Sequence, residues 1–269
     1  MSLRQGVAYF VLSGQRWSYI GLVTHEQRIP PVEDLLAFID EQEKRLLGRA
    51  YDIEKKDIRE FQVIYGVCAQ AIRYAAAFAA LHRASRPREA VVLARQAIEH
   101  AATAQWAHFT NQGVEKLIAT IQATHLDFYN TASVWLENEQ LVAAMEAETE
   151  RIGQVGKGMP KVVDILRAID QRHFLEMVYK QQSQLAHVTS SSTTGFLRME
   201  GGEMKILPTP DDPHGANTPY IAAMAAMFAA WLVEDLIVGK PGLERLDQQS
   251  DELLLPINVE ESVLREKTD

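Results

Sequence analysis

The sequence predicts an all-α protein, an antiparallel helical bundle with a small β-hairpin inserted near residues 194–208. Three observations favour this fold class. Apolar residues recur at spacings of three and four through most of the chain, as they do on one face of a helix. Proline stands where several of these stretches begin, which is a common first helical residue. Two short apolar runs around Gly201 and Gly202 are the one stretch that indicates paired strands.

The first expected helices lie between residues 30 and 109. Pro30 and Pro31, with acidic residues directly after them, predict a helix start, and Gly48 is a candidate for its end. A second helix is expected over about 54–82, where apolar residues form a stripe at helical spacing. The third, over about 87–109, is apolar on more than one side, which is typical of the central helix of a bundle.

The second half of the chain continues the helical pattern. A long helical stretch follows Gly113 to about residue 151, with residues 126–131 as a candidate break. A glycine-rich loop at 153–160 precedes a short helix to 169 and another helix over about 172–187. After the hairpin, an alanine-rich helix is expected from residue 218 to about 239.

The alanine-rich helix needs apolar neighbours, so we expect a single helical domain over residues 1–269. Residues 1–28 would form an N-terminal extension, and the polar residues 245–269 a loosely ordered C-terminal tail.

Composition narrows the function classes. The chain has 27 basic and 36 acidic residues, a net charge of −9, which disfavours broad nucleic-acid binding. Its single cysteine, Cys68, cannot form an internal disulfide, which indicates a reducing compartment. The most apolar stretch, residues 220–233, is 14 residues long. A membrane span needs about 20, so we expect a buried core helix, a cytoplasmic protein and no membrane contact.

The chain lacks the usual metal and phosphate motifs. It contains no CxxC, HExxH or ExxH pattern, and His100 and His108 stand too far apart along one helix to share an ion easily. The glycine-rich stretch 153–158 lacks the spacer and the Ser/Thr of a P-loop. We therefore predict no metal and no cofactor.

Two short motifs place polar groups on helical faces that should be buried. Arg95 and Glu99 stand at i and i+4 on the most apolar helix, where burial is costly unless they meet a partner. Tyr179, Ser183 and His187 stand at i, i+4 and i+8 and form a polar stripe. His187 falls near the end of its helix, where it could serve as an acid or base.

These motifs support three functions. In the main interpretation they form a buried Arg/Glu/Tyr/Ser/His network of a binding or structural protein, which could form homo-oligomers through an alanine-rich face. In another, they converge with His100 on a pocket for a small polar ligand, in a small-molecule enzyme or binder. The hairpin and the loop 208–217 could then cover that pocket as a lid.

The order of these motifs resembles a bacterial domain-of-unknown-function family of helical proteins. The resemblance rests on the Arg-x3-Glu pair Arg95–Glu99 and on the later Tyr-x3-Ser and histidine of Tyr179, Ser183 and His187, and it spans about residues 87–239. It implies a helical fold and no established activity.

That family is similar in outline to HEPN domains, many of which are metal-independent ribonucleases with an Arg-x4–6-His motif. Arg95–His100 and Arg167–His173 have this spacing. The similarity implies the third candidate function, a ribonuclease with RNA as its partner. In it, His187 or His100 would act on the ribose 2′-hydroxyl and Arg95 would stabilise the phosphorane charge.

Overall fold

The computed structural model describes residues 30–46, 49–135, 140, 142–147, 158–170, 173–189, 192–193, 195–208 and 217–257. Its elements are helices α2 (Val32–Leu46), α3 (Ile58–Arg83), α4 (Pro87–Phe109), α5 (Gly113–Trp135), α7 (Val162–Ile169) and α8 (Phe174–Ala186), strands β1 (Leu197–Glu200) and β2 (Glu203–Ile206), and helices α10 (Thr218–Asp235) and α11 (Leu243–Leu253). The two strands form one antiparallel hairpin, which pairs Leu197 with Ile206 and Glu200 with Glu203. The predicted fold class, all-α with a small hairpin, is confirmed.

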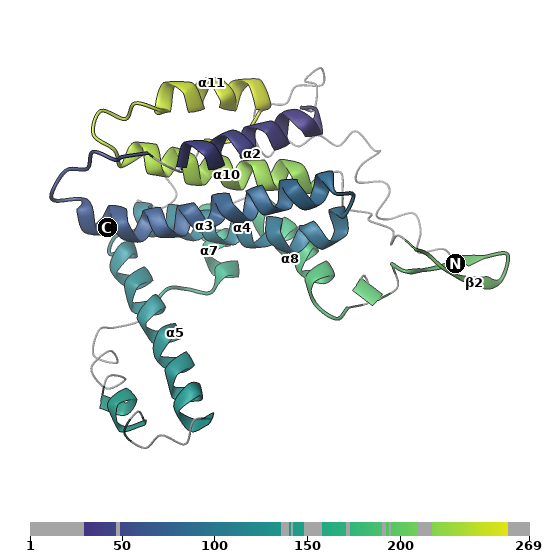
Figure 1. Cartoon of the computed structure of the whole chain (residues 1–269), viewed down its shortest axis with the longest axis horizontal. Coiled ribbons are helices and arrows are strands. Elements are labelled where there is room, and N and C mark those ends of the chain that lie inside the picture. The colour runs from purple at the N-terminus through teal and green to yellow at the C-terminus, as the bar shows by residue number, and fades with distance from the viewer. Residues whose placement is uncertain are drawn as a thin grey trace.

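Helices α3, α4 and α10 form the centre of the bundle. A tight turn at residues 84–86 joins α3 to α4, and these two helices pack along each other. Helix α10 lies against both of them and against α2, while α8 and α7 pack on α4 (Figure 1). One continuous cluster of buried apolar side chains draws on α2, α3, α4, the start of α5, α7, α8, α10 and α11.

Helix α10 is buried on nearly every side. Every residue from Ile221 to Ala230 is buried, and its alanines are almost fully excluded from solvent. Small side chains let neighbouring helix axes approach closely, and a helix without a polar face has to be enclosed. The expected core helix at 220–233 is therefore confirmed. The alanine-rich face is used within the chain and offers no surface to a second copy.

Helix α3 is, among the described helices, the one long and apolar enough to cross a membrane by composition. In the structure it packs between α2, α4 and α10.

Helix α5 differs from its prediction. It runs without a break through residues 126–131 and ends at Trp135, and residues 142–147 are helical again. Its first turns contact α4 and α3, whereas the rest extends away from the bundle (Figure 1).

The hairpin also extends away from the bundle (Figure 1). All eight strand residues are exposed, so the hairpin does not act as the lid that we considered. Its base is held near the start of α4, where the Arg88 guanidinium lies 5.3 Å from the Phe196 ring centre. Residues 209–216 of the second candidate lid lie outside the described residues.

The C-terminal region corrects a further expectation. Residues 243–253, which we expected to be mostly loose from 245 onward, form helix α11. Leu246 is buried, and the Tyr220 hydroxyl donates a 2.6 Å hydrogen bond to the Leu254 carbonyl. The proposed N-terminal extension, the loop at 153–157 and residues 258–269 lie outside the described residues.

Substituting a buried alanine of α10 tests this packing. We expect Ala226→Leu to lower the free energy of unfolding by about 1–3 kcal/mol, because a well-packed core has no room for three extra carbons. Urea denaturation followed by circular dichroism measures it. Ala80→Leu, on the exposed face of α3, is the matched control and should change little. Equal effects of both substitutions would contradict a close-packed α10.

Candidate functional site

The structure brings four of the predicted site residues together between α4 and α8. Arg95 on α4 donates from Nε to the Ser183 hydroxyl at 2.9 Å and from Nη2 to the Tyr179 hydroxyl at 2.5 Å. Its guanidinium also lies over the Tyr179 ring, 4.5 Å from the centroid. Glu99, one turn further along α4, lies 3.7 Å from Arg95 Nη2. We call these four residues the Arg95 cluster.

The local helix geometry explains why these residues meet. Positions 95 and 99 share one face of α4, and positions 179 and 183 share one face of α8. The Ser183 hydroxyl donates in turn to the Tyr179 carbonyl at 2.7 Å, which holds its lone pairs towards Arg95. Only 13% of the Arg95 side chain is exposed, so its charge depends on these partners.

The surroundings of Glu99 and Tyr179 determine the charge balance of the Arg95 cluster. The Glu99 Oε2 atom is buried and has no hydrogen-bond partner, so its charge is balanced mainly by Arg95 across 3.7 Å. Burial raises the pKa of Tyr179 and the Glu99 charge raises it further, against the opposite effect of Arg95. Tyr179 therefore remains a neutral phenol at neutral pH and accepts the Arg95 hydrogen bond.

The two predicted histidines do not join this cluster. His187 is the residue that ends α8; its backbone N–H donates to the Ser183 carbonyl at 3.2 Å, and its side chain is exposed. His100 lies on α4 with Nδ1 2.8 Å from the Gln96 carbonyl, and its ring packs edge-on against Tyr74 of α3. Among the described contacts, none links either imidazole to Arg95.

A second polar group forms where α7 is followed by α8. Glu176 accepts hydrogen bonds from Arg167 Nε at 2.8 Å and Nη2 at 2.7 Å, and from Lys180 at 2.5 Å. His173 Nδ1 lies 3.2 Å from the same carboxylate. Arg167 above all, and then Lys180, hold the pKa of Glu176 well below its usual range. Arg167 and His173, which the sequence singled out only by spacing, thus share one partner.

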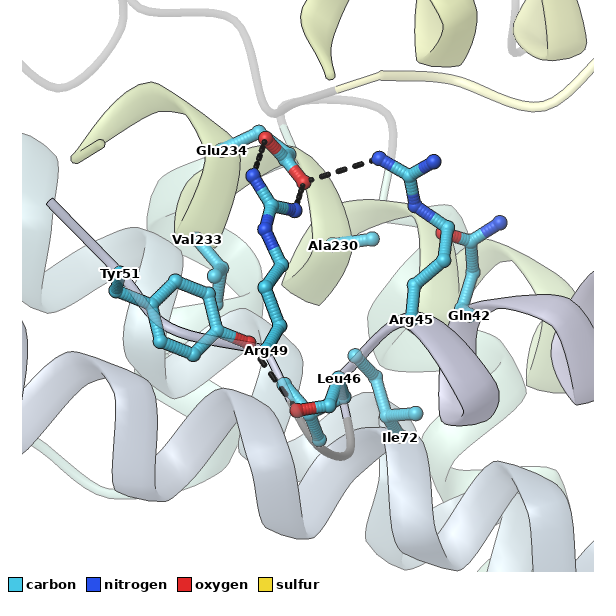
Figure 2. Close-up of a pocket in the computed structure, with 9 residues that line it drawn as sticks. All are labelled: Gln42, Arg45, Leu46, Arg49, Tyr51, Ile72, Ala230, Val233 and Glu234. Atoms are coloured by element: carbon cyan, nitrogen blue, oxygen red, sulfur yellow. Dashed lines mark hydrogen bonds and ion pairs between the residues drawn. The ribbon is translucent and has the colours of Figure 1, made fainter. Parts of the chain in front are cut away.

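A pocket that we did not predict lies between α2 and α10 (Figure 2). Arg49 forms two hydrogen bonds with the Glu234 carboxylate, and Arg45 Nη2 donates to Glu234 Oε1 at 3.3 Å. The pocket is lined by Gln42, Arg45, Leu46, Arg49, Tyr51, Ile72, Ala230, Val233 and Glu234.

The neighbouring backbone places Glu234 in this pocket. A Cβ atom on residue 242 would overlap the Glu234 carboxylate, so Gly242 is what allows α11 to begin this close. Burial alone would raise the pKa of Glu234, but Arg49 and Arg45 outweigh it, and the pKa lies below its usual value. Glu234 is therefore ionised at neutral pH. The sequence signal was an acidic residue within the core-facing part of the most apolar helix, which has to find a cation.

The Arg95 cluster predicts a specific stability effect. We expect Arg95→Met to lower the free energy of unfolding by about 2–4 kcal/mol, because it leaves the partly buried Glu99 carboxylate, whose Oε2 atom is buried, without a counter-charge. Adding Glu99→Gln should recover part of the loss, which urea denaturation of the single and double variants would measure. His187→Ala is the control and should change stability by less than about 0.5 kcal/mol. If the double variant recovered no stability relative to Arg95→Met, the Glu99 carboxylate would not need Arg95 as its counter-charge.

The lowered pKa of Glu234 predicts that the free energy of unfolding depends on pH. Its pKa is lowered in the folded state, so its contribution is complete above the unfolded pKa and is lost as pH falls through the folded one. At pH 7, Glu234→Gln should cost about 2–3 kcal/mol, less than for a fully buried pair because both arginines are partly exposed. Denaturation at pH 7 and in acid would measure the difference in free energy of unfolding between the wild type and Glu234→Gln, which should shrink in acid. Glu54→Gln, at an exposed position, is the control. A pH-independent difference would contradict an ionised Glu234.

Comparison with known proteins supports the expected resemblance to a domain-of-unknown-function family. A family model described as "Family of unknown function (DUF5677)" matches residues 61–204, more than half of the chain. No curated protein and no solved structure matched. The matched region contains the Arg95 cluster and Glu176, whereas Arg45, Arg49 and Glu234 lie outside it. The chain therefore belongs to the DUF5677 family, a family of unknown function.

Proposed function

We propose that this protein is a binding or structural protein in which the Arg95 cluster holds α8 against α4. The observation that carries this proposal is that Arg95 directs its donors to Tyr179 and Ser183 of the same chain. An arginine that stabilises charge in a reaction must direct donors towards a substrate. Tyr179 is kept neutral, and the His187 ring is not in contact with the cluster. Buried Cys68 supports a cytoplasmic, reducing location.

The binding surface that we propose is residues 121–135 of α5, which we call the α5 arm. Its exposed side chains are more apolar than a solvated helix requires: Trp135 is 82% exposed and Phe128 is 64% exposed, and Ile121 and Tyr129 are exposed beside them. The arm stands clear of the bundle (Figure 1). A contiguous group of exposed aromatic and aliphatic side chains is typical of a protein interface.

The partner that fits this surface is a second copy of the chain. Two copies each carry a net charge of −9 and repel, but Asp127 is the single Asp, Glu, Lys or Arg residue within the arm, so contact there brings few like charges together. At about 200 Å² for each aromatic side chain, the exposed groups offer roughly 500 Å² per copy. Two arms would then bury about 1,000 Å², the lower bound of a specific interface.

Self-association through the arm is directly measurable. We expect sedimentation velocity to show a dimer for the wild type and a monomer for Phe128→Asp and Trp135→Asp, because a buried charge opposes the contact. Met204→Asp, which adds the same charge to an exposed apolar position on β2, is the matched control and should stay dimeric. A monomeric wild type at high concentration, or a dimer in all variants, would contradict the role of the arm.

The alternative function is a HEPN-like, metal-independent ribonuclease. One observation favours it: Arg167 and His173, which have the Arg-x4–6-His spacing, meet at Glu176 and are 46% and 63% exposed, so a phosphodiester could reach them. His173 would act on the 2′-hydroxyl, and Arg167 would have to release Glu176, to which it donates two hydrogen bonds, in order to stabilise the phosphorane charge. The acidic net charge is unfavourable for this function.

A metal-free incubation with a mixed RNA pool tests this alternative. Under the binding proposal the wild type leaves the RNA intact. Cleavage that is lost in folded His173→Ala and Arg167→Ala, but kept in Arg95→Ala and His187→Ala, would establish the ribonuclease and its residues. If cleavage were lost in Arg95→Ala or His187→Ala instead, the catalytic residues would be those that the sequence first indicated.

A further inference from the structure

One side of the β1–β2 hairpin is an exposed apolar surface. The register pairs Leu197 with Ile206 and Met199 with Met204. Directly paired residues project to the same side of a hairpin, and alternate residues along a strand share a side. These four side chains therefore form one surface, which we call the hairpin face. Each of the four residues is exposed, from 42% for Leu197 to 80% for Ile206.

The opposite side of the hairpin is charged. Its residues are Arg198, Glu200, Glu203 and Lys205. Gly201 and Gly202, which have φ angles of +61° and +88°, form the tight turn that sets this register. The hairpin is thus amphipathic, with one side suited to water and one side of the kind that is normally covered. An isolated two-stranded hairpin is only marginally stable in water, and packing of its apolar side against another segment stabilises it.

The base of the hairpin is held where α3 ends and α4 begins. Arg88, in the first turn of α4, donates from Nη2 to the Ser192 carbonyl at 3.1 Å, and its guanidinium lies 5.3 Å from the Phe196 ring centre. A Cβ atom on residue 195 would overlap this guanidinium, so Gly195 is what allows the close approach. The hairpin therefore projects from one defined end of the bundle (Figure 1).

The chain that precedes α2 joins the bundle at the same end. Glu33, in the first turn of α2, lies 3.0 Å from Arg83, the last residue of α3, and the turn at 84–86 separates Arg83 from α4. Residues 1–29, which lie outside the described residues, are thus connected to the bundle near the base of the hairpin. At about 3.3 Å per extended residue, residues 13–29 span up to about 55 Å, so residues 7–12 are within reach of the hairpin face.

The composition of residues 1–29 suits the hairpin face. Residues 7–12 read Val-Ala-Tyr-Phe-Val-Leu, a run of six apolar residues rich in aromatic and β-branched side chains, which pack well on a pleated surface. Residues 1–29 also contain three arginines and one glutamate. The chain's net charge of −9 therefore divides into +2 for residues 1–29 and −11 for residues 30–269, so the segment is attracted to the rest of its own chain.

We propose that residues 7–12 pack on the hairpin face of their own chain. Their apolar side chains lie against Met199 and Met204, whose unbranched side chains adapt to an irregular partner. Removal of apolar surface from water on both sides of the contact is the driving force. Because the segment is tethered near the base of the hairpin, its effective concentration is high, and a contact too small for a separate partner is sufficient. This inference does not rest on the α5 arm or on the Arg95 cluster.

Hydrogen exchange of the full chain, followed by mass spectrometry, tests the contact. We expect the amides of residues 7–12 to exchange at least tenfold more slowly in the wild type than in Met199→Lys, because a charge on the hairpin face opposes its burial. Glu203→Gln makes the same change in net charge on the charged side of the hairpin, and as the matched control it should exchange as the wild type does. Circular dichroism checks that both variants are folded. Equal exchange of residues 7–12 in the wild type and in Met199→Lys would overturn the proposal.

Disulfide trapping shows which chain supplies the segment. Tyr9→Cys and Phe10→Cys, which project to opposite sides of an extended chain, are each combined with Met204→Cys and with Lys205→Cys. Cys68 is fully buried and does not compete. In a glutathione redox buffer, one of the two pairs with Met204→Cys should form an internal disulfide at least fivefold faster than either pair with Lys205→Cys, because the bond requires close and aligned Cβ atoms. Equal rates for all pairs, or a disulfide formed between two chains, would contradict the proposal.

Discussion

The enclosure of α10 is the constraint on which the rest of the structure depends. A helix whose residues 221–230 are all buried has no face to offer to water, so α2, α3 and α4 have to surround it. Within this core, Gln105 of α4 is fully buried and donates from Nε2 to the Phe228 carbonyl at 3.0 Å. Apolar contact therefore supplies the driving force, and a few buried polar contacts fix how the helices are aligned.

The polar groups of the molecule lie where this core ends. Glu234 stands at the end of the buried part of α10 and is matched by arginines of α2 and of the segment after it. Arg95 stands on a side of α4 that is covered by α8, and it is matched by side chains of α8. Each cation thus joins a peripheral helix to a central one. The two sites differ in that Arg95 makes close contacts with several side chains, whereas Arg45 makes one long hydrogen bond.

Much of the fold could be predicted, because helical periodicity is a local property. The helices beginning at Val32, Pro87 and Thr218 start within a few residues of their predicted positions. Helix α11 was missed because Leu246 and Ser250 are its main buried side chains, and so short an apolar stripe resembles a polar tail. The extension of α5 away from the bundle depends on packing that periodicity does not describe.

The candidate site could be predicted only in part. The i, i+4 spacings correctly paired Arg95 with Glu99 and Tyr179 with Ser183, and the cost of burial implied that the pairs would meet. Extending the stripe to His187 failed because the helix ends at Ala186, so residue 187 no longer follows the helical face. The pocket at Glu234 brings together residues that are far apart in the chain, such as Arg49 and Glu234. Local spacing carries no information on such contacts.

Hydrogen exchange tests most directly whether the Arg95 cluster holds α8 in place. The measurement would compare amide exchange of α8 and of α10 in the wild type and in Arg95→Met at neutral pH. If the cluster holds α8 against α4, the amides of residues 174–186 should exchange faster in the variant while those of residues 221–230 stay protected. Unchanged protection of α8 in a folded Arg95→Met protein would contradict that account and would favour a chemical role for Arg95.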